Sequence, residues 1–237
     1  MTNGRGSFAA GTVALAATRR YHGLLVAALQ PPVDRHVLVA KCDVVIDYRG
    51  RRYALGANRY RDGTVDPHGY RLLDRFTLDG QVPAWTWRVG DLTVRQRIWM
   101  AREEDTSYLA IDVLGASAAV NVTLIPFCAG RDYHALVRAH DGIKVSPAQG
   151  GCVVTMPGCP PCRLRVDAAV FTVASAWHRD LHYACEAERG LDDVEDLFNP
   201  GLFRGELARG ETVTLSCSIA RATTAAALAW RRAVEHD

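Results

Sequence analysis

Hydrophobic and polar residues alternate with a period of two over much of this chain. Residues 212–219, TVTLSCSI, place an apolar side chain at every second position, with Thr or Ser between them, and residues 120–124, VNVTL, follow the same rule. Period-two alternation puts one set of side chains on a buried face and the other in water, which is typical of antiparallel sheets. We therefore expect strands over residues 23–29, 36–47, 52–55, 70–78, 84–89, 92–100, 106–114, 119–126, 151–156, 163–174 and 212–220.

Short turns join several of these segments. Residues 48–51, YRGR, and residues 89–91, VGD, each separate two strand patterns and predict hairpins. About eleven short strands with turn signals and few helical patterns indicate a mainly β protein, a large antiparallel β-sandwich. A parallel α/β fold is disfavoured because no amphipathic helices separate the strands.

Two segments depart from the strand pattern. Residues 190–205, GLDDVEDLFNPGLFRG, predict a short acidic helical turn that ends at Asn-Pro-Gly, 199–201. Residues 222–236 are rich in alanine and predict a C-terminal helix, with Thr223 or Thr224 as its N-cap. Since no Pro/Gly/Ser-rich linker divides the chain, we expect one sandwich domain over 1–221, followed by a helix or linker over 222–237.

Composition excludes several classes of protein. The 237 residues carry 28 Lys and Arg against 26 Asp and Glu, a net charge of +2, and 49% of them are hydrophobic. This balance is typical of a globular chain and gives no electrostatic footprint for nucleic acid. No apolar run approaches the roughly 18 residues of a transmembrane helix, and the start, MTNGRGSFAAG, lacks a secretory signal. We therefore expect a cytoplasmic protein with neither nucleic acid nor membrane as a partner.

The seven cysteines are odd in number and irregularly spaced, which predicts free thiols in a reducing compartment. Cys159 and Cys162, with His178 and His182, have the spacing of a Cys2His2 zinc site. However, a zinc finger places its histidines on a helix, whereas RLRVDAAVFTV, which leads towards them, predicts a strand. We favour two loop thiols and two surface histidines, and expect neither a metal site nor a cofactor.

Two acidic clusters, residues 103–105 and 186–196, could supply the paired carboxylates that hydrolysis requires. The first follows a strand and is expected to be a solvated loop. The second lies near Trp177, Tyr183 and Arg189 in sequence. A tryptophan ring, an arginine and carboxylates together suit a sugar, although a surface loop with local salt bridges is the simpler interpretation.

Residues 18–25, TRRYHGLL, place charged and aromatic side chains directly before an apolar strand. If these residues were extended, Arg20 and His22 would share one face and Arg19 and Tyr21 the other. Ligand binding and a charge cluster that pairs with the acidic loop are both open interpretations.

Several sequence blocks, in order along almost the whole chain, resemble the N-terminal domain of bacterial and archaeal glycogen debranching enzymes of the amylo-α-1,6-glucosidase type. The most specific blocks are TRRYHGLL and ERGLD with EDLFNPG. The matching blocks are TNGRGSFAAGT (2–12), TRRYHGLLVAAL (18–29), RHVL (35–38), NRY (58–60), PHGY (67–70), RDYH (131–134), and the residues Trp177, Tyr183, Glu186, 188–191, 195–197, 199–201 and Phe203.

The resemblance implies a β-supersandwich that precedes an (α/α)6 barrel, and in that family the barrel carries the acid and base that cleave α-1,6-linked glucose from glycogen. Because Asp237 ends the sequence where such a barrel would begin, we expect no catalytic residue in this chain. Its partner would be the barrel, in cis or in trans, and α-glucan is a further candidate. The predicted contact residues, for substrate or barrel, are Arg20, Tyr21, His22, Trp177, Glu188, Arg189, Glu195 and Asp196.

Tyr21 and Trp177 would stack on sugar or fill the barrel interface, and Arg20 and Arg189 would donate paired hydrogen bonds. Interface or structural roles are preferred to direct sugar contact. Two other functions stay open: a free-standing α-glucan-binding module, and an interaction partner of a separately encoded barrel. An independent small enzyme is disfavoured, because no nucleophile and base stand out together.

Overall fold

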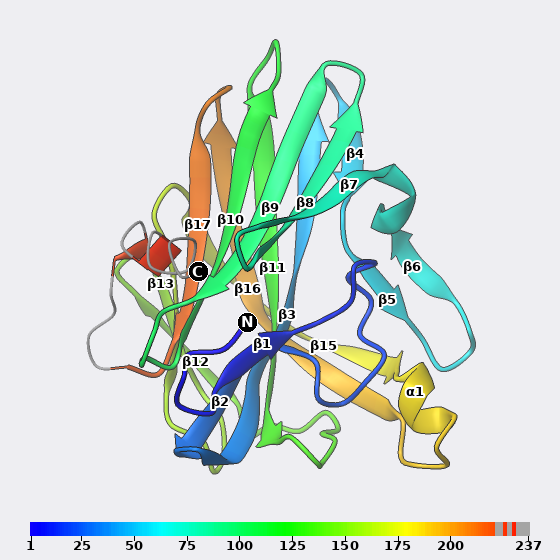
Figure 1. Cartoon of the computed structure of the whole chain (residues 1–237), viewed down its shortest axis with the longest axis vertical. Helices are drawn as coiled ribbons and strands as arrows, with labels where there is room; N and C mark the ends of the chain where they lie inside the picture. Colours follow the sequence, from blue (N-terminus) through cyan, green and yellow to red (C-terminus); the bar gives the residue numbers. More distant parts are fainter. Residues whose placement is uncertain (221–224, 227–228, 231–237) are drawn as a thin grey trace.

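The chain folds into two large antiparallel sheets packed face to face (Figure 1). The computed structural model describes residues 1–220, 225–226 and 229–230. Strands dominate these residues, so the prediction of a mainly β, large antiparallel sandwich is confirmed. In the described part of the chain, no helix is long and apolar enough to cross a membrane.

The first sheet has seven strands, and its longest members run through the whole sandwich. Neighbours along its main path all pair antiparallel. The order is β1 (Phe8–Ala10), β2 (Gly23–Gln30), β3 (Val33–Tyr48), β11 (Val120–Asp132), β16 (Val194–Leu207) and β15 (Val170–His182), with β4 (Arg51–Ala54) paired to β3.

The second sheet has eight strands, also antiparallel. Its order is β12 (Lys144–Ala148), β13 (Gly151–Thr155), β14 (Cys162–Val166), β17 (Thr212–Ser218), β10 (Thr106–Gly115), β9 (Leu92–Met100), β8 (Val82–Val89) and β7 (Leu73–Asp79). A small hairpin of β5 (Ala57–Arg59) and β6 (Val65–His68) leads into the 3-10 turn η1 (Gly69–Leu72), and the short helix α1 (Ala184–Ala187) follows β15.

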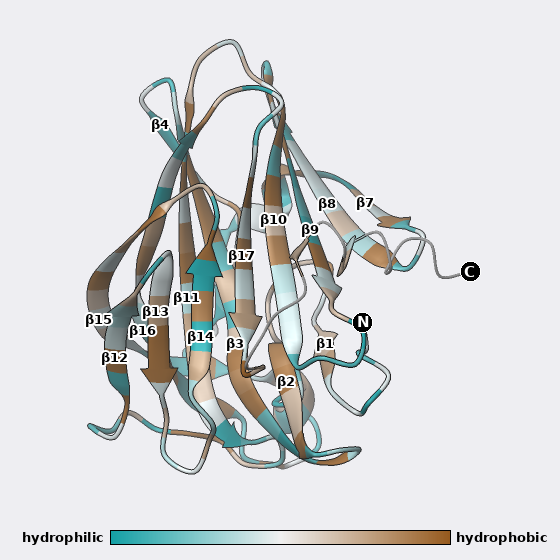
Figure 2. Cartoon of the chain, turned by 90° about the vertical axis from the view of Figure 1, so that its left-hand side faces the viewer, coloured by the Kyte–Doolittle hydropathy of each residue, from teal (hydrophilic) through white to brown (hydrophobic). Residues whose placement is uncertain are grey.

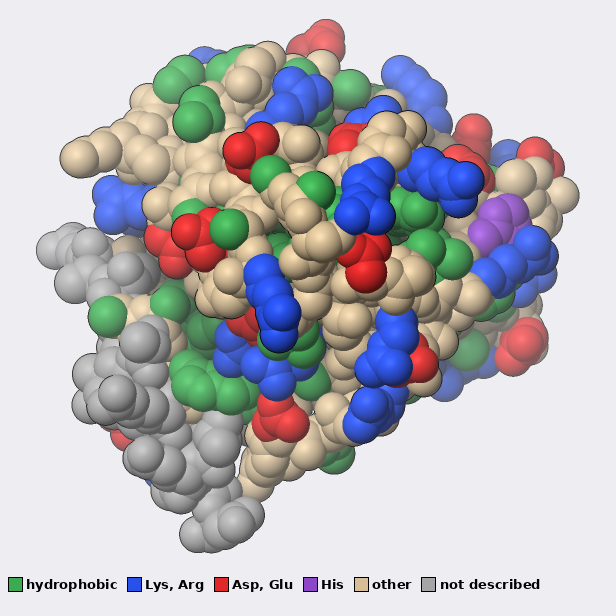
Figure 3. Space-filling model, turned by 90° about the horizontal axis from the view of Figure 1, so that it is seen from above, with side chains coloured by type: hydrophobic (Ala, Val, Ile, Leu, Met, Phe, Trp, Pro, Cys, Tyr) green, Lys and Arg blue, Asp and Glu red, His purple; other side chains and the backbone are tan. Residues whose placement is uncertain are grey.

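The hydrophobic core lies where the inner faces of the two sheets meet. Leu215 and Cys217 of β17 are fully buried, together with Ile111 of β10 and Leu124 of β11. Figure 2 shows the hydrophobic stretches along β2, β3 and β10 that supply this core. Seen from above, the surface instead mixes basic and acidic side chains (Figure 3), which fits the near-neutral net charge.

Both predicted hairpins are present. Residues 48–51 join β3 to β4, with Arg49 and Gly50 at φ of 49° and 72°, and Gly90 at φ 59° lies between β8 and β9. Positive φ at the turn matches the twist of paired strands and is adopted most easily by glycine. The pattern also located β9 at residues 92–100, as the structure has it.

The helical turn predicted over 190–205 is wrong. Residues Val194–Leu207 form β16, and the short helix α1 lies earlier, at Ala184–Ala187. The first eight residues of β16 are all buried, so the strand shows no period-two pattern in the sequence. Its Asn199-Pro200-Gly201 segment fits in because the pairing with β15 shifts register opposite it.

The single strand predicted over 163–174 is also wrong, because the segment divides between the two sheets. β14 ends at Val166 in the second sheet and β15 begins at Val170 in the first. The turn between them is held by Asp167, whose carboxylate accepts a hydrogen bond of 2.7 Å from the Thr214 amide. A change of sheet between two β-rich segments leaves no mark in residue type.

Most of the predicted helix over 222–236, including both possible N-caps, lies outside the described residues. Of this segment, Ala226, Ala229 and Trp230 have helical backbone. Trp230 packs edge-on against Trp99 of β9, with ring centroids 5.4 Å apart. The guanidinium of Arg97 lies 4.2 Å from the centre of the Trp230 ring, so this residue contacts the second sheet.

Candidate functional site

Buried ionic groups gather at one end of the first sheet, near α1. The β5–β6 hairpin lies on the same side of the molecule (Figure 1) and contacts β15 there through the Arg61 amide and the Asp180 carbonyl. At the centre of this end is Glu195 of β16, which is completely buried. Its carboxylate accepts hydrogen bonds from Arg131 Nε, from Arg131 Nη2 at 2.9 Å, from the Tyr183 hydroxyl and from the Val137 amide at 3.1 Å.

These contacts pair Glu195 with Arg131 inside the protein. Burial lowers the pKa of Arg131, but the Glu195 carboxylate and Tyr183 together outweigh burial, so that the net change is upward. Burial and the same carboxylate raise the pKa of Tyr183 well above its usual value. The oxygens of Glu195 are therefore engaged by the protein and do not reach solvent.

A second ionic cluster joins Arg20, Glu186 and Arg189. Arg20 donates hydrogen bonds of 2.7 Å to the carbonyls of His134 and Asp192, and its Nε lies 3.6 Å from Glu186 Oε2. Arg189 Nη1 lies 3.7 Å from the same oxygen. Two cations thus compensate the fully buried Glu186, which belongs to the second acidic cluster but not to the predicted contact residues.

Asp196 of β16 connects the loop at residues 138–139 with Asp180 of β15. Its carboxylate accepts hydrogen bonds of 2.9 Å from the amides of Ala139 and Asp180, and lies 3.5 Å from Arg138 Nη1. Like Glu195, it fixes backbone rather than presenting its oxygens to solvent.

The segment 18–22 is a turn, so the expected strand-like alternation of its side chains is wrong. The His22 amide donates to the Arg19 carbonyl at 3.1 Å, and β2 begins only at Gly23. Tyr21 contacts the His134 ring, with its hydroxyl 3.1 Å from Nδ1. His22 accepts a hydrogen bond from the Thr18 amide at 3.2 Å; burial, with the charge of Arg19, lowers its pKa.

The other predicted contact residues lie nearer the surface. Trp177 is half-buried and donates to the His140 carbonyl at 3.2 Å, and its ring packs against Phe198. Glu188 is exposed at the end of α1. The structure therefore divides the predicted set into buried supports and side chains that lie nearer the surface.

The buried supports shape a polar groove of about 480 Å³. Arg20 holds the Asp192 carbonyl, Glu195 holds the Val137 amide, and Asp196 lies beside Arg138. The groove is lined by Arg61, Leu136, Arg138, Asp192, Asp193 and Val194. Sequence patterns did not identify Arg61 and Arg138, because neither stands in a recognisable motif.

The residues with zinc-site spacing are not brought together. Cys162 is fully buried on β14 of the second sheet, so it is not a loop thiol, and burial raises its pKa to about 12. His178 is on β15 of the first sheet and packs edge-on against Phe127, while His182 Nε2 lies 3.0 Å from Asp193. Among the described residues, no group of three or more His, Cys, Asp or Glu could hold a metal ion.

One family model matches most of the chain. The model described as "Glycogen debranching enzyme N terminal" matches residues 1–214. The chain belongs to this family. The resemblance inferred from the sequence blocks is thereby confirmed for the N-terminal domain of debranching enzymes.

No curated protein matches this debranching-enzyme domain. Among solved structures, it is similar to a bacterial glucoamylase complexed with acarbose, with 9% sequence identity and a TM-score of 0.43. That match covers 100% of this chain and 36% of the glucoamylase chain, so the domain spans little more than a third of that protein's length.

Proposed function

We propose that this chain is a non-catalytic part of a glycogen debranching enzyme, which packs on an (α/α)6 catalytic barrel and borders the glucan site. The family match over residues 1–214, almost the entire sandwich, carries this proposal. The barrel, in cis or in trans, would supply the acid and base that hydrolyse α-1,6-linked glucose. Residues 222–237 would connect the sandwich towards it, and the seven free cysteines suit a cytoplasmic enzyme.

The polar groove is the part of the surface that we assign to the border of the glucan site. Arg61, Arg138, Asp192 and Asp193 offer both donors and acceptors, as recognition of sugar hydroxyls requires. Its walls are held from behind by Arg20, and by Glu195 and Asp196 from β16, so the groove is pre-organised. Tyr21, Trp177, Glu188 and Arg189 lie nearer the surface and are proposed as barrel contacts.

The non-catalytic role is tested by glucose release from a branched limit dextrin. The purified chain is expected to release no glucose above a protein-free blank. Glucose release that persists through purification to constant specific activity would show that the chain itself is catalytic.

A free-standing α-glucan-binding module is the second candidate, because the groove is polar and present in this chain by itself. It predicts slower migration in a native gel that contains glycogen, and Arg138→Ala should reduce the retardation. Arg209→Ala is the matched control, since this exposed arginine follows the far end of the 14-residue strand β16. Equal migration with and without glycogen would reject autonomous binding and leave the border role to be measured with the barrel.

A further inference from the structure

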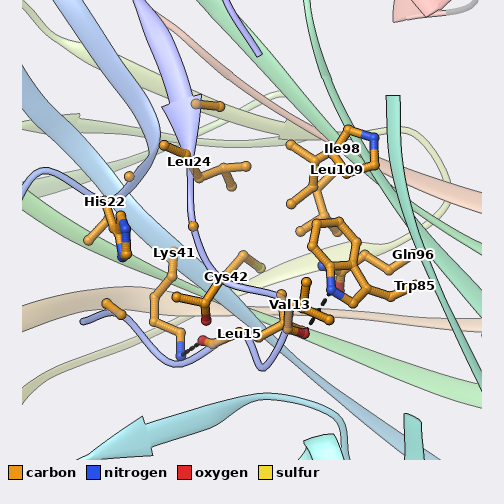
Figure 4. A pocket seen from close by; sticks show the side chains of 18 of the residues that line it. Val13, Leu15, His22, Leu24, Lys41, Cys42, Trp85, Gln96, Ile98 and Leu109 are labelled. Carbon is orange, nitrogen blue, oxygen red and sulfur yellow. Dashed lines mark hydrogen bonds between the residues drawn. The ribbon is translucent and has the colours of Figure 1, made fainter. Parts of the chain in front are cut away.

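A cavity of about 310 Å³ lies between the two sheets, and none of its lining residues belongs to the polar groove. Figure 4 shows its walls. Trp85, Ile98 and Leu109 enter from β8, β9 and β10 of the second sheet. Leu24 of β2 and Leu15 of the loop before it complete an apolar lining. Its volume is that of a small-molecule site.

Most polar groups around this cavity are used by the protein; His22, which also lines it, accepts a hydrogen bond from the Thr18 amide through Nδ1. Trp85 Nε1 donates to the Val13 carbonyl at 2.9 Å. Lys41 Nζ donates to the carbonyls of Leu15 and Ala57 and to Asn58 Oδ1, at 3.1, 2.7 and 2.7 Å. These groups are therefore unavailable to an incoming molecule.

Gln96 is the exception. Its side chain lines the cavity and is only 1% exposed, yet Oε1 accepts no hydrogen bond from the residues that the structure describes. A buried carbonyl oxygen without a partner is costly, and such groups normally have one. Gln96 stands opposite Trp85 in the β8–β9 pairing, so the acceptor lies next to a large apolar surface.

We propose that this cavity binds a small, mostly apolar molecule that carries one hydrogen-bond donor, a hydroxyl or an N–H group, directed at Gln96 Oε1. A sugar is a poor occupant, because its many hydroxyls would lose water against an apolar wall. The site goes beyond the proposed function, since it requires neither glucan nor barrel.

The experiment compares two probes of similar shape by titration calorimetry of the whole chain. 2-Naphthol has an apolar bicyclic ring and one hydroxyl donor, whereas 2-methylnaphthalene has no donor. Both should bind saturably, and 2-naphthol about fivefold more tightly, as expected for one net hydrogen bond. Gln96→Leu should abolish the preference, and Ile98→Trp should prevent binding of both probes by filling the cavity.

Equal affinity of the wild-type chain for both probes would overturn the proposal, and so would saturable binding that survives Ile98→Trp. If Gln96→Leu fails to fold, the comparison of the two probes in the wild-type chain decides by itself. Arg138→Ala, in the groove, should bind both probes as the wild type does, so that failure here is distinguishable from failure of the glucan proposal.

Discussion

The sandwich core and the centre of the ionic end of the first sheet are equally buried, but they are stabilised by different interactions. Leu215 in the core and Glu195 at the ionic end are each 0% exposed. Leu215 gains from leaving water in almost any orientation, whereas Glu195 is stable only with Arg131, Tyr183 and the Val137 amide in place. Equal burial can therefore mean unequal tolerance to substitution.

The largest expected effect is that of Glu195→Ala, at about 3–5 kcal/mol of unfolding free energy, because it leaves the buried Arg131 without a counter-charge. Urea unfolding followed by circular dichroism measures it. The double variant Arg131→Met/Glu195→Leu should recover much of the loss. A double variant as unstable as the sum of the single effects would contradict the view that pairing dominates this end.

Leu215→Ala should cost about 3 kcal/mol, from lost transfer free energy and the cavity left between the sheets. Leu215→Met should cost less than about 1.5 kcal/mol, because it nearly conserves volume. The same urea assay compares the pair. If Leu215→Met lost as much unfolding free energy as Leu215→Ala, the core would tolerate substitution no better than the ionic end does, and the two regions would not differ in this respect.

Asp112, on the outer side of the second sheet, carries a charge whose contribution to stability can be measured. It accepts hydrogen bonds from Arg95 Nε at 2.9 Å, Arg97 Nη2 at 2.6 Å and Thr212 Oγ1 at 2.8 Å. Burial raises the pKa of Asp112, but its hydrogen bonds and the charge of Arg97 outweigh burial and lower the pKa overall. The ionised carboxylate of Asp112 therefore stabilises the folded state relative to the protonated form.

Asp112→Asn should thus cost about 2 kcal/mol at pH 7, a typical value for hydrogen bonds to a charged group. The carboxylate's contribution is complete above about pH 4, the unfolded pKa, and is lost as pH falls through the lower folded value. Unfolding free energies of both proteins from pH 7 to pH 2 should converge at the acid end. A constant gap would show that the charge is not responsible.

The smallest effect is expected at the Asp47–Arg52 pair of the β3–β4 hairpin. Its side chains are 43% and 67% exposed, and the charged atoms lie 3.4 Å apart. Asp47→Ala should change stability by less than about 0.5 kcal/mol, because water screens the pair. Thermal unfolding at low and high salt checks this; a loss comparable with that of Glu195→Ala would remove the distinction between buried and exposed pairs.

The sandwich could be predicted because apolar and polar side chains alternate along a strand that is buried on one face only. β9 and β17 follow that rule, but β16 is buried on both faces over its first half and carries Glu195 and Asp196 there. In sequence, such a strand resembles an acidic surface loop, because the basic side chains that pair with its carboxylates lie elsewhere in the chain. The arginine that neutralises Glu195 lies 64 residues earlier, on β11, and only the fold brings them together.

The sequence blocks and the groove of the candidate site share few residues. The sequence blocks contained Arg20, Glu195 and Asp196, and the structure shows that these residues support the groove rather than line it. Arg61 and Arg138, which line it, come from the β5–β6 hairpin and from the loop after β11. Arg61 follows the NRY block and Arg138 follows the RDYH block, but neither arginine belongs to a block, and only the fold brings the two segments together.

The contact between Trp99 and Trp230 has an optical consequence. Two indole rings 5.4 Å apart and inclined at 76° are close enough for their electronic transitions to couple. Such a pair gives a two-signed signal in circular dichroism that vanishes when the rings separate. The circular dichroism of this pair therefore reports whether Trp230 is packed on the second sheet, without any added label.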